Sequence, residues 1–194
     1  AGFGMNLMGW WLDGRYLSYF TTDLSGGILY LLPLEGAGDR KPIEASRSTS
    51  TVQGARLSPD SRFLSYMSNQ SGRAEMYVRP VDVTGNGAPA GGPWQVSTDG
   101  GLGMGFWRED GKEFYYLAAD RGFMAVDVNA GATLQFGKPR LLFRLPEALG
   151  VTVGTASVSR DGERFVLAAP AEPRLQQLTV FDRQGNVLNR LGEP

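Results

Sequence analysis

The feature that most constrains the fold of this chain is one phrase that occurs four times in 194 residues. Each copy contains a polar turn with an aspartate, a short apolar stretch, a second polar turn and another apolar stretch. The copy "LSPDSRFLSYMSNQSGRAEMYVRPV" (57–81) shows this order most clearly. The turn aspartates follow one another at intervals of 47, 50 and 51 residues, and they are Asp13, Asp60, Asp110 and Asp161. Self-similarity at a nearly fixed spacing indicates a repeat architecture.

The repeating unit is predicted to consist of strands. Its apolar stretches lack the 3.6-residue period of an amphipathic helix, and a β-type repeat near 50 residues is typical of propeller blades. In the second copy we expect strands at 52–57, 62–68, 74–81 and 94–97. The sequence therefore predicts an all-β, β-propeller-like fold with four blade repeats of four antiparallel strands each, either self-contained or part of a larger propeller. We expect one domain, 1–194, with approximate repeats at 1–48, 49–98, 99–149 and 150–194.

The second strand of each repeat is apolar or small on both of its faces, as "FLSYMS" and "FYYLAA" illustrate. This pattern predicts a sheet that is packed on both sides, as a blade between two neighbours would be. An aromatic residue stands three places after the aspartate in the first two copies (Tyr16, Phe63) and four places after it in the last two (Phe114, Phe165). We interpret the difference as one additional residue in the later turns.

Two further features of the repeat have structural interpretations. Glycine clusters just before each predicted first strand, in "AGFGMN" (1–6), "VQGA" (52–55), "GGLGMG" (100–105) and "GVTVGT" (150–155). First strands line the axis of a propeller, where backbones converge and side chains crowd. We expect the four turn aspartates to be structural caps, because an aspartate in a turn can accept a hydrogen bond from the backbone two residues on.

The composition excludes several functional classes. The chain has no histidine and no cysteine, so the commonest general base, the commonest metal ligand and the thiolate nucleophile are missing. We therefore expect no enzymatic activity, no catalytic residue, no cofactor and no metal site. The net charge of −1 is evenly spread along the chain, which argues against a nucleic-acid partner. No apolar run approaches the length of a membrane span, so no direct membrane span is expected.

The stretch "FGMNLMGWW" (3–11) is the strongest candidate for binding. Trp10 and Trp11 would lie on opposite faces of one strand, and we expect both to belong mainly to the blade core. The alternative is a docking surface for another protein, because Trp and Met are enriched at the centres of interfaces. The residues of this candidate docking surface are Phe3, Met5, Met8, Trp10 and Trp11.

The repeats also resemble a known family. "LSPDSRFLSYMSNQSGRAEMYVRP" followed by "WQVSTDGG", together with "FWREDGKEFYYLAADRGFMAVDV" and "SVSRDGERFVLAAP", is similar to the WD40-like PD40 repeat of TolB-type β-propellers. The resemblance implies a bacterial protein with a periplasmic or otherwise extracytoplasmic location. Such repeats frequently form the C-terminal part of bacterial serine/threonine kinases. The family usually has glycine where this chain has Ser61, and usually has six or more blades.

The leading hypothesis is a non-catalytic protein-binding or scaffold module, an extracytoplasmic or extrinsic part of a larger, membrane-associated assembly. The alternatives are a ligand-sensing propeller domain of a transmembrane serine/threonine kinase and the accessory propeller of a hydrolase. The partner would be another protein or missing propeller blades, since an open ring of four blades leaves two bare apolar faces. We expect these faces to carry Tyr16, Tyr19 and Tyr30 on the first repeat and Phe165, Val180 and Phe181 on the fourth.

Overall fold

The protein is all-β. The computed structural model describes residues 4–11, 14–23, 26–35, 41–48, 50, 52–81, 91–131, 133–147, 156–171 and 175–191. Every regular element in these ranges is a strand. No helix in the described part is long and apolar enough to cross a membrane. The predicted all-β class is confirmed.

The strands form four antiparallel sheets, which we call blades 1 to 4. Blade 1 contains β1 (Gly4–Trp11), β2 (Tyr16–Asp23), β3 (Gly26–Pro33) and β4 (Ile43–Ser48). Blade 2 contains β5 (Val52–Leu57), β6 (Phe63–Ser68), β7 (Glu75–Pro80) and β8 (Trp94–Gln95). Blade 3 contains β9 (Gly101–Trp107), β10 (Glu113–Ala118), β11 (Gly122–Ala130), β12 (Leu134–Phe136) and β13 (Arg140–Arg144). Blade 4 contains β14 (Ala156–Val158), β15 (Arg164–Ala171), β16 (Leu175–Asp182) and β17 (Val187–Leu191).

Strands follow one another across each sheet in chain order, as the predicted hairpin repeat requires. Blade 3 differs from the expected four strands, because β12 and β13 both pair with β11. The pairing of β12 covers Val128–Ala130 and that of β13 covers Gly122–Ala125. The two short strands therefore share the outermost position of this blade.

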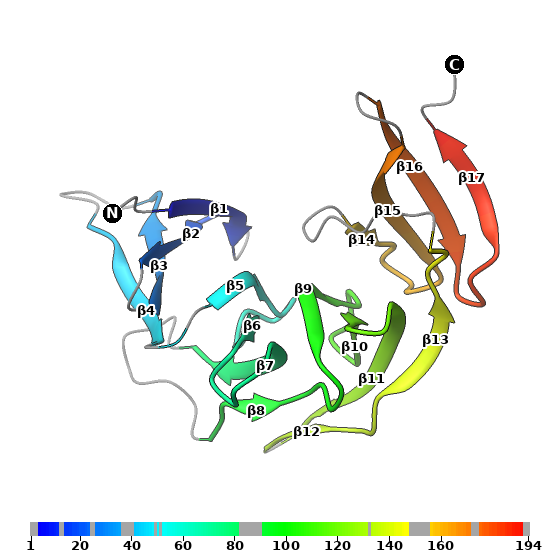
Figure 1. Cartoon of the computed structure of the whole chain (residues 1–194). Coiled ribbons are helices and arrows are strands. Elements are labelled where there is room, and N and C mark those ends of the chain that lie inside the picture. The colour runs from blue at the N-terminus through cyan, green and yellow to red at the C-terminus, as the bar shows by residue number, and fades with distance from the viewer. Residues whose placement is uncertain are drawn as a thin grey trace.

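Figure 1 shows the four blades as an arc, with β1, β5, β9 and β14 on its inner side and blades 1 and 4 at its two ends. The inner strands need close approach. A Cβ added at Gly105 of β9 would lie 2.1 Å from Cζ of Phe114, and one added at Gly101 would lie 2.6 Å from Cγ of Met76 in blade 2. The steric reason expected for glycine in first strands applies at these two positions.

A separate hydrophobic core lies between each pair of successive blades. The second strand of blade 3 shows how one sheet serves two cores, because all six residues of β10 are buried. Phe114 and Tyr116 belong to the core shared with blade 2, and Tyr115 and Leu117 to the core shared with blade 4. Within the described residues no core joins blade 4 to blade 1, so the ring is open. The predicted two-sided packing of propeller blades is confirmed.

The turns between first and second strands have the same length in each described copy, and our interpretation of an additional residue is wrong. The backbone N–H of Ser58 bonds the carbonyl of Phe63, and that of Ser159 bonds the carbonyl of Arg164, five residues on in both cases. Arg108 and Glu113 make the same bond in blade 3. Equivalent positions are therefore Phe63, Glu113 and Arg164.

Phe114 and Phe165 are consequently one strand position further along than Phe63. Because neighbouring residues of a strand point to opposite faces, these two phenylalanines face the preceding blade, whereas Phe63 faces the following one. The expected open face of blade 4 is corrected accordingly. Phe165 and Phe181 are buried against blade 3, and only Val180 of the three predicted residues lies on the other side.

Candidate functional site

The predicted docking residues belong to β1, the inner strand of blade 1. Met5 is 71% exposed. Met8, Trp10 and Trp11 lie in the same strand, and the structure describes their backbone but not their side chains. Phe3 lies outside the described residues. The docking of a partner by these residues stays a prediction.

Blade 1 turns an apolar face away from blade 2, and Met5 belongs to it. Met5 pairs with Thr21 and Leu7 pairs with Tyr19, so both side chains share the face of Tyr19. Leu7 is 68% exposed. Alternation along β2 and β3 adds other partly exposed residues to this face. We call this set the uncovered face of blade 1, and it consists of Met5, Leu7, Leu17, Tyr19, Ile28, Tyr30 and Leu32. Tyr16, predicted for this surface, instead packs toward blade 2.

Blade 2 carries the covered counterpart of this face. Tyr19 and Tyr30 are directly opposed on β2 and β3 and stack with ring centroids 5.3 Å apart. Tyr66 and Tyr77 are opposed in the same way on β6 and β7 and stack at 5.8 Å. The blade 2 pair is 2% and 3% exposed because the core shared with blade 1 covers it. Burial raises the pKa of Tyr66 to about 12.

The described turn aspartates accept the hydrogen bonds that the repeat suggests. Oδ1 of Asp60 accepts from the backbone N–H of Arg62 at 3.2 Å, that of Asp110 from Lys112 at 3.0 Å, and that of Asp161 from Glu163 at 3.0 Å. In Asp161 the hydrogen bond from Ser159, followed by that backbone bond, lowers the carboxyl pKa. Asp13 lies outside the described residues. The effect of these contacts on stability stays a prediction.

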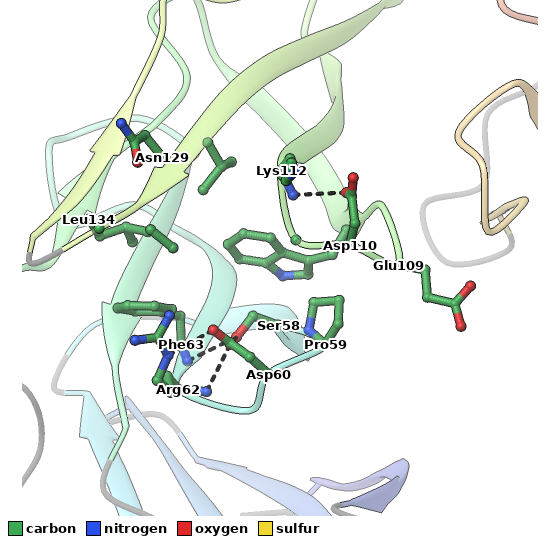
Figure 2. Close-up of a pocket in the computed structure, with 15 residues that line it drawn as sticks. Ser58, Pro59, Asp60, Arg62, Phe63, Glu109, Asp110, Lys112, Asn129 and Leu134 are labelled. Carbon is green, nitrogen blue, oxygen red and sulfur yellow. Dashed lines mark hydrogen bonds and ion pairs between the residues drawn. The ribbon is translucent and has the colours of Figure 1, made fainter.

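Next to these turns, a pocket of about 720 Å³ lies between blades 2 and 3. Figure 2 shows it between the turn that contains Ser58, Pro59 and Asp60, the turn that contains Asp110 and Lys112, and the end of the β11–β12 hairpin. Its apolar lining includes Phe63, Trp107, Val128 and Leu134. The volume is within the range of ligand pockets, which is roughly 300–1,000 Å³.

A second hollow of about 500 Å³ lies between the corresponding turns of blades 3 and 4. It shares Glu109 and Asp110 with the first pocket, so the two hollows flank one turn from its two sides. Arg160 and Asp161 form its far wall. Together the hollows follow the row of turns across three blades.

The sequence did not reveal the role of Glu113 at the start of β10, a buried carboxylate that pairs with three arginines. This carboxylate is 2% exposed and accepts hydrogen bonds from Arg108, Arg140, Arg183 and the hydroxyl of Tyr115. Burial alone would raise its pKa, but the bonds from Arg183 and Tyr115 outweigh burial and lower the pKa. Arg183 belongs to blade 4, so the cluster ties two blades together. The only sequence signal was a glutamate where the other repeats have Tyr16, Phe63 or Arg164.

The side chains at these sites supply apolar contacts and ion pairs. The complete sequence has neither histidine nor cysteine. Among the described residues, no group of three or more acidic side chains is arranged to hold a metal ion. The charged groups near the pocket are largely engaged with one another, as Asp60 is with Arg62 and Asp110 with Arg108.

Solved structures share this arrangement of blades. TolB from Acinetobacter baumannii superposes with a TM-score of 0.69 at 16% sequence identity, over 99% of this chain and 44% of that chain. The fold is that of a TolB-like β-propeller. The predicted resemblance to TolB-type and WD40-like propellers is thereby confirmed at the level of the fold. This chain spans less than half of the length of that TolB chain.

Other propellers with different roles also match. A chain of the nidogen–laminin complex superposes with a TM-score of 0.56 at 12% identity, over 98% of this chain and 64% of that one. A chain from a study of two prolyl endopeptidases gives 0.55 at 16% identity, over 97% and 27%. No family model matches this TolB-like propeller, and no curated protein sequence matches it. Sequence identities this low show only that the folds are similar.

Proposed function

We propose that this TolB-like propeller is a non-catalytic protein-interaction module that docks its partner on the uncovered face of blade 1. The observation that carries the proposal is the contrast between this face and its counterpart on blade 2, which an adjoining blade covers. Soluble monomers rarely expose apolar patches of more than a few hundred Å². A face built like a blade interface therefore favours a protein or a further blade as its cover.

The similarity to a chain of the nidogen–laminin complex supports a role in protein interaction, since that structure was determined as a complex of two proteins. The resemblance to TolB supports an extracytoplasmic setting as part of a membrane-associated assembly, and we propose that setting on this ground alone. The prolyl endopeptidase match favours the accessory propeller of a hydrolase as a second candidate. The kinase sensor domain stays a prediction from the sequence.

The proposal is tested on the purified 194-residue chain by analytical ultracentrifugation and by binding of a hydrophobic dye. We expect self-association or strong dye binding for the wild type. Leu7→Lys should reduce both, because it places a charge on the uncovered face. The matched control is Leu188→Lys, since Leu188 is an exposed leucine on blade 4 outside this face.

A monomer that binds no dye would contradict the proposal, as would equal effects of the two substitutions. If the proposal holds, a photoreactive residue at position 7 should crosslink to a defined partner, whereas the same residue at position 188 should not. Crosslinks of equal yield from both positions would indicate non-specific capture.

A further inference from the structure

Blade 4 has an apolar sheet face that belongs to none of the described cores. Val166 and Val180 are directly opposed on β15 and β16, so their side chains share the side that faces away from blade 3. Leu178 lies two places before Val180 on β16 and therefore belongs to the same side. Leu178 is 37% exposed, and the two valines are partly exposed. We call Val166, Leu178 and Val180 the open face of blade 4.

The equivalents of Leu178 and Val180 are covered in the three other blades. In each blade these positions lie four and two places before the residue that pairs with the first residue of the second strand. In blades 1 to 3 their side chains are at most 1% exposed, because the next blade covers them. These covered equivalents are Leu29, Leu31, Met76, Val78, Phe123 and Ala125. Blade 4 thus carries the same kind of face, with no following blade among the described residues.

The open face of blade 4 has a charged border. Arg164 and Asp182 are directly opposed where β15 begins, at one end of this face. Their opposite charges leave the border without net charge. An apolar centre beside a polar rim is the usual composition of a protein interface.

The contact between blades 1 and 2 shows what such a face binds. Leu29 and Leu31 of blade 1 share a core with Tyr66 and Tyr77 of blade 2, whose rings stack on each other. A pair of aliphatic side chains on one sheet therefore packs with a pair of tyrosines on the next.

The two ends of the chain offer the same two halves. Blade 4 carries Leu178 and Val180 at the positions of the aliphatic pair. The uncovered face of blade 1 carries Tyr19 and Tyr30 at the positions of the tyrosine pair. Figure 1 shows blades 1 and 4 at opposite ends of the arc, so the two halves do not meet within one molecule. Blade 4 of one copy and blade 1 of another can repeat the existing contact.

We propose that the chain associates head to tail, with the open face of blade 4 of one copy packed on the uncovered face of blade 1 of a second copy. This rests on the proposed function, since it names the partner of the blade 1 face, and it adds an interaction surface on blade 4. The contact is heterologous, because it joins different surfaces of the two copies.

The association is weaker than the contact between blades of one chain. Separate copies lose translational and rotational freedom when they associate, and blades that are already linked do not. We expect a dissociation constant of about 10–100 µM. Unfolding experiments at about 0.1 µM therefore report on the separate chain.

The first test is the sedimentation of the purified chain between about 0.1 and 500 µM. We expect monomers at the lowest concentration and associated copies at the highest. Leu7→Lys and Leu178→Lys should each raise the dissociation constant at least about tenfold, because each places a charge in the contact. The matched control is Leu141→Lys, which should leave the constant unchanged, since Leu141 is an exposed leucine on β13 of blade 3.

A mixture of the two variants tests the head-to-tail arrangement. The copy with Leu7→Lys keeps an intact blade 4, and the copy with Leu178→Lys keeps an intact blade 1. An equimolar mixture should therefore form pairs at least about tenfold more tightly than either variant alone. This rescue would also show that both variants are folded. Contact between two blade 1 faces would instead leave Leu178→Lys fully associated, and mixing would rescue nothing.

Three results would each overturn the proposal: a wild type that stays monomeric at every concentration, an equal loss in Leu141→Lys, and a mixture that does not associate. A monomeric wild type whose dye binding is reduced by Leu7→Lys would overturn this proposal alone. The proposed function would then stand with a different partner on blade 1, so the two proposals fail separately.

Discussion

Blades 1 and 2 carry the same stacked tyrosine pair at the same repeat positions, and only one of the pairs is covered. Tyr66 and Tyr77 are buried under blade 1, whereas Tyr19 and Tyr30 face away from every described core. The two tyrosine pairs are alike, although blade 2 has Glu75 and Arg79 where blade 1 has Ile28 and Leu32. The tyrosine pair by itself therefore does not decide whether a face is buried. Its place in the arc decides this.

The equivalent side of blade 2 shows what kind of surface the uncovered face is. On blade 2, this side of the sheet receives Phe20, Leu29 and Leu31 of the preceding blade. Blade 1 has the same kind of side and no preceding blade among the described residues. The face is therefore built as one half of an interface between sheets, and a flat β-sheet surface of apolar side chains is the shape that fits it.

The largest expected effect comes from removing one tyrosine from each pair. Tyr66→Ala should lower the free energy of unfolding by about 3–5 kcal/mol, as for other large aromatic residues removed from a core. Tyr19→Ala should cost about 1 kcal/mol, mainly through the lost ring stacking. Urea denaturation of both variants measures the difference.

Tyr66→Phe is the control for that pair of variants, because it keeps the ring and should cost less than about 1 kcal/mol. Equal costs for Tyr19→Ala and Tyr66→Ala would contradict the difference in burial between the two pairs. That result would mean that the face of blade 1 is covered in solution by another copy of the chain.

The next prediction concerns blades 3 and 4, whose contact includes a buried charge as well as apolar side chains. Beside the core between blades 3 and 4, the buried carboxylate of Glu113 pairs with three arginines, and one of them, Arg183, belongs to blade 4. Glu113→Gln should cost about 3 kcal/mol, because the arginines lose their shared counter-charge. The pKa of Glu113 is lowered in the folded protein from an ordinary value of 4.5. The ionised carboxylate therefore stabilises the fold above about pH 4.5, and this contribution is lost as the pH falls through the lowered folded value.

Urea denaturation at a series of pH values checks this. The difference between wild type and Glu113→Gln should be largest at neutral pH and should shrink below about pH 4.5. Glu44→Gln is the control, since Glu44 pairs with Arg47 on the exposed surface and should cost less than about 1 kcal/mol. A difference for Glu113→Gln that does not change with pH would show that shape rather than charge holds blades 3 and 4 together.

The sequence predicted the architecture well because the repeat carries it. Turn residues, strand lengths and two-sided apolar patterns are local, and the strands of blade 2 lie within two residues of their expected limits. Which face meets which neighbour was harder to predict. A shift of one position reverses the side of a strand, and for this reason Phe165 was expected on the wrong face.

The binding surfaces depend on contacts that the local pattern does not contain. Glu113 meets Arg140 and Arg183, which are 27 and 70 residues away in the chain. The pocket at Trp107 arises where turns of two blades and a hairpin end come together. Met5 was expected at a docking surface from composition, whereas its neighbour Leu7 became a candidate only when its partner across the sheet, Tyr19, was known.

We expect the smallest effects from substitutions in the first turns of blades 1 and 2. Gly14 has a φ of +84°, and the equivalent residue of blade 2, Ser61, has a φ of +63°. A side chain is strained in this left-handed region, whereas glycine is not. Ser61→Gly should therefore stabilise the chain by up to about 1 kcal/mol, and Gly14→Ser should destabilise it by about 1 kcal/mol. A Cβ at Gly14 would meet no atom within 4 Å, so the cost there is one of backbone conformation alone. The midpoints of urea denaturation give both values. Stability changes of opposite sign would show that backbone strain decides both turns, although blade 2 is covered and blade 1 is open. A loss of stability in Ser61→Gly would mean that contacts of the buried serine outweigh its backbone strain.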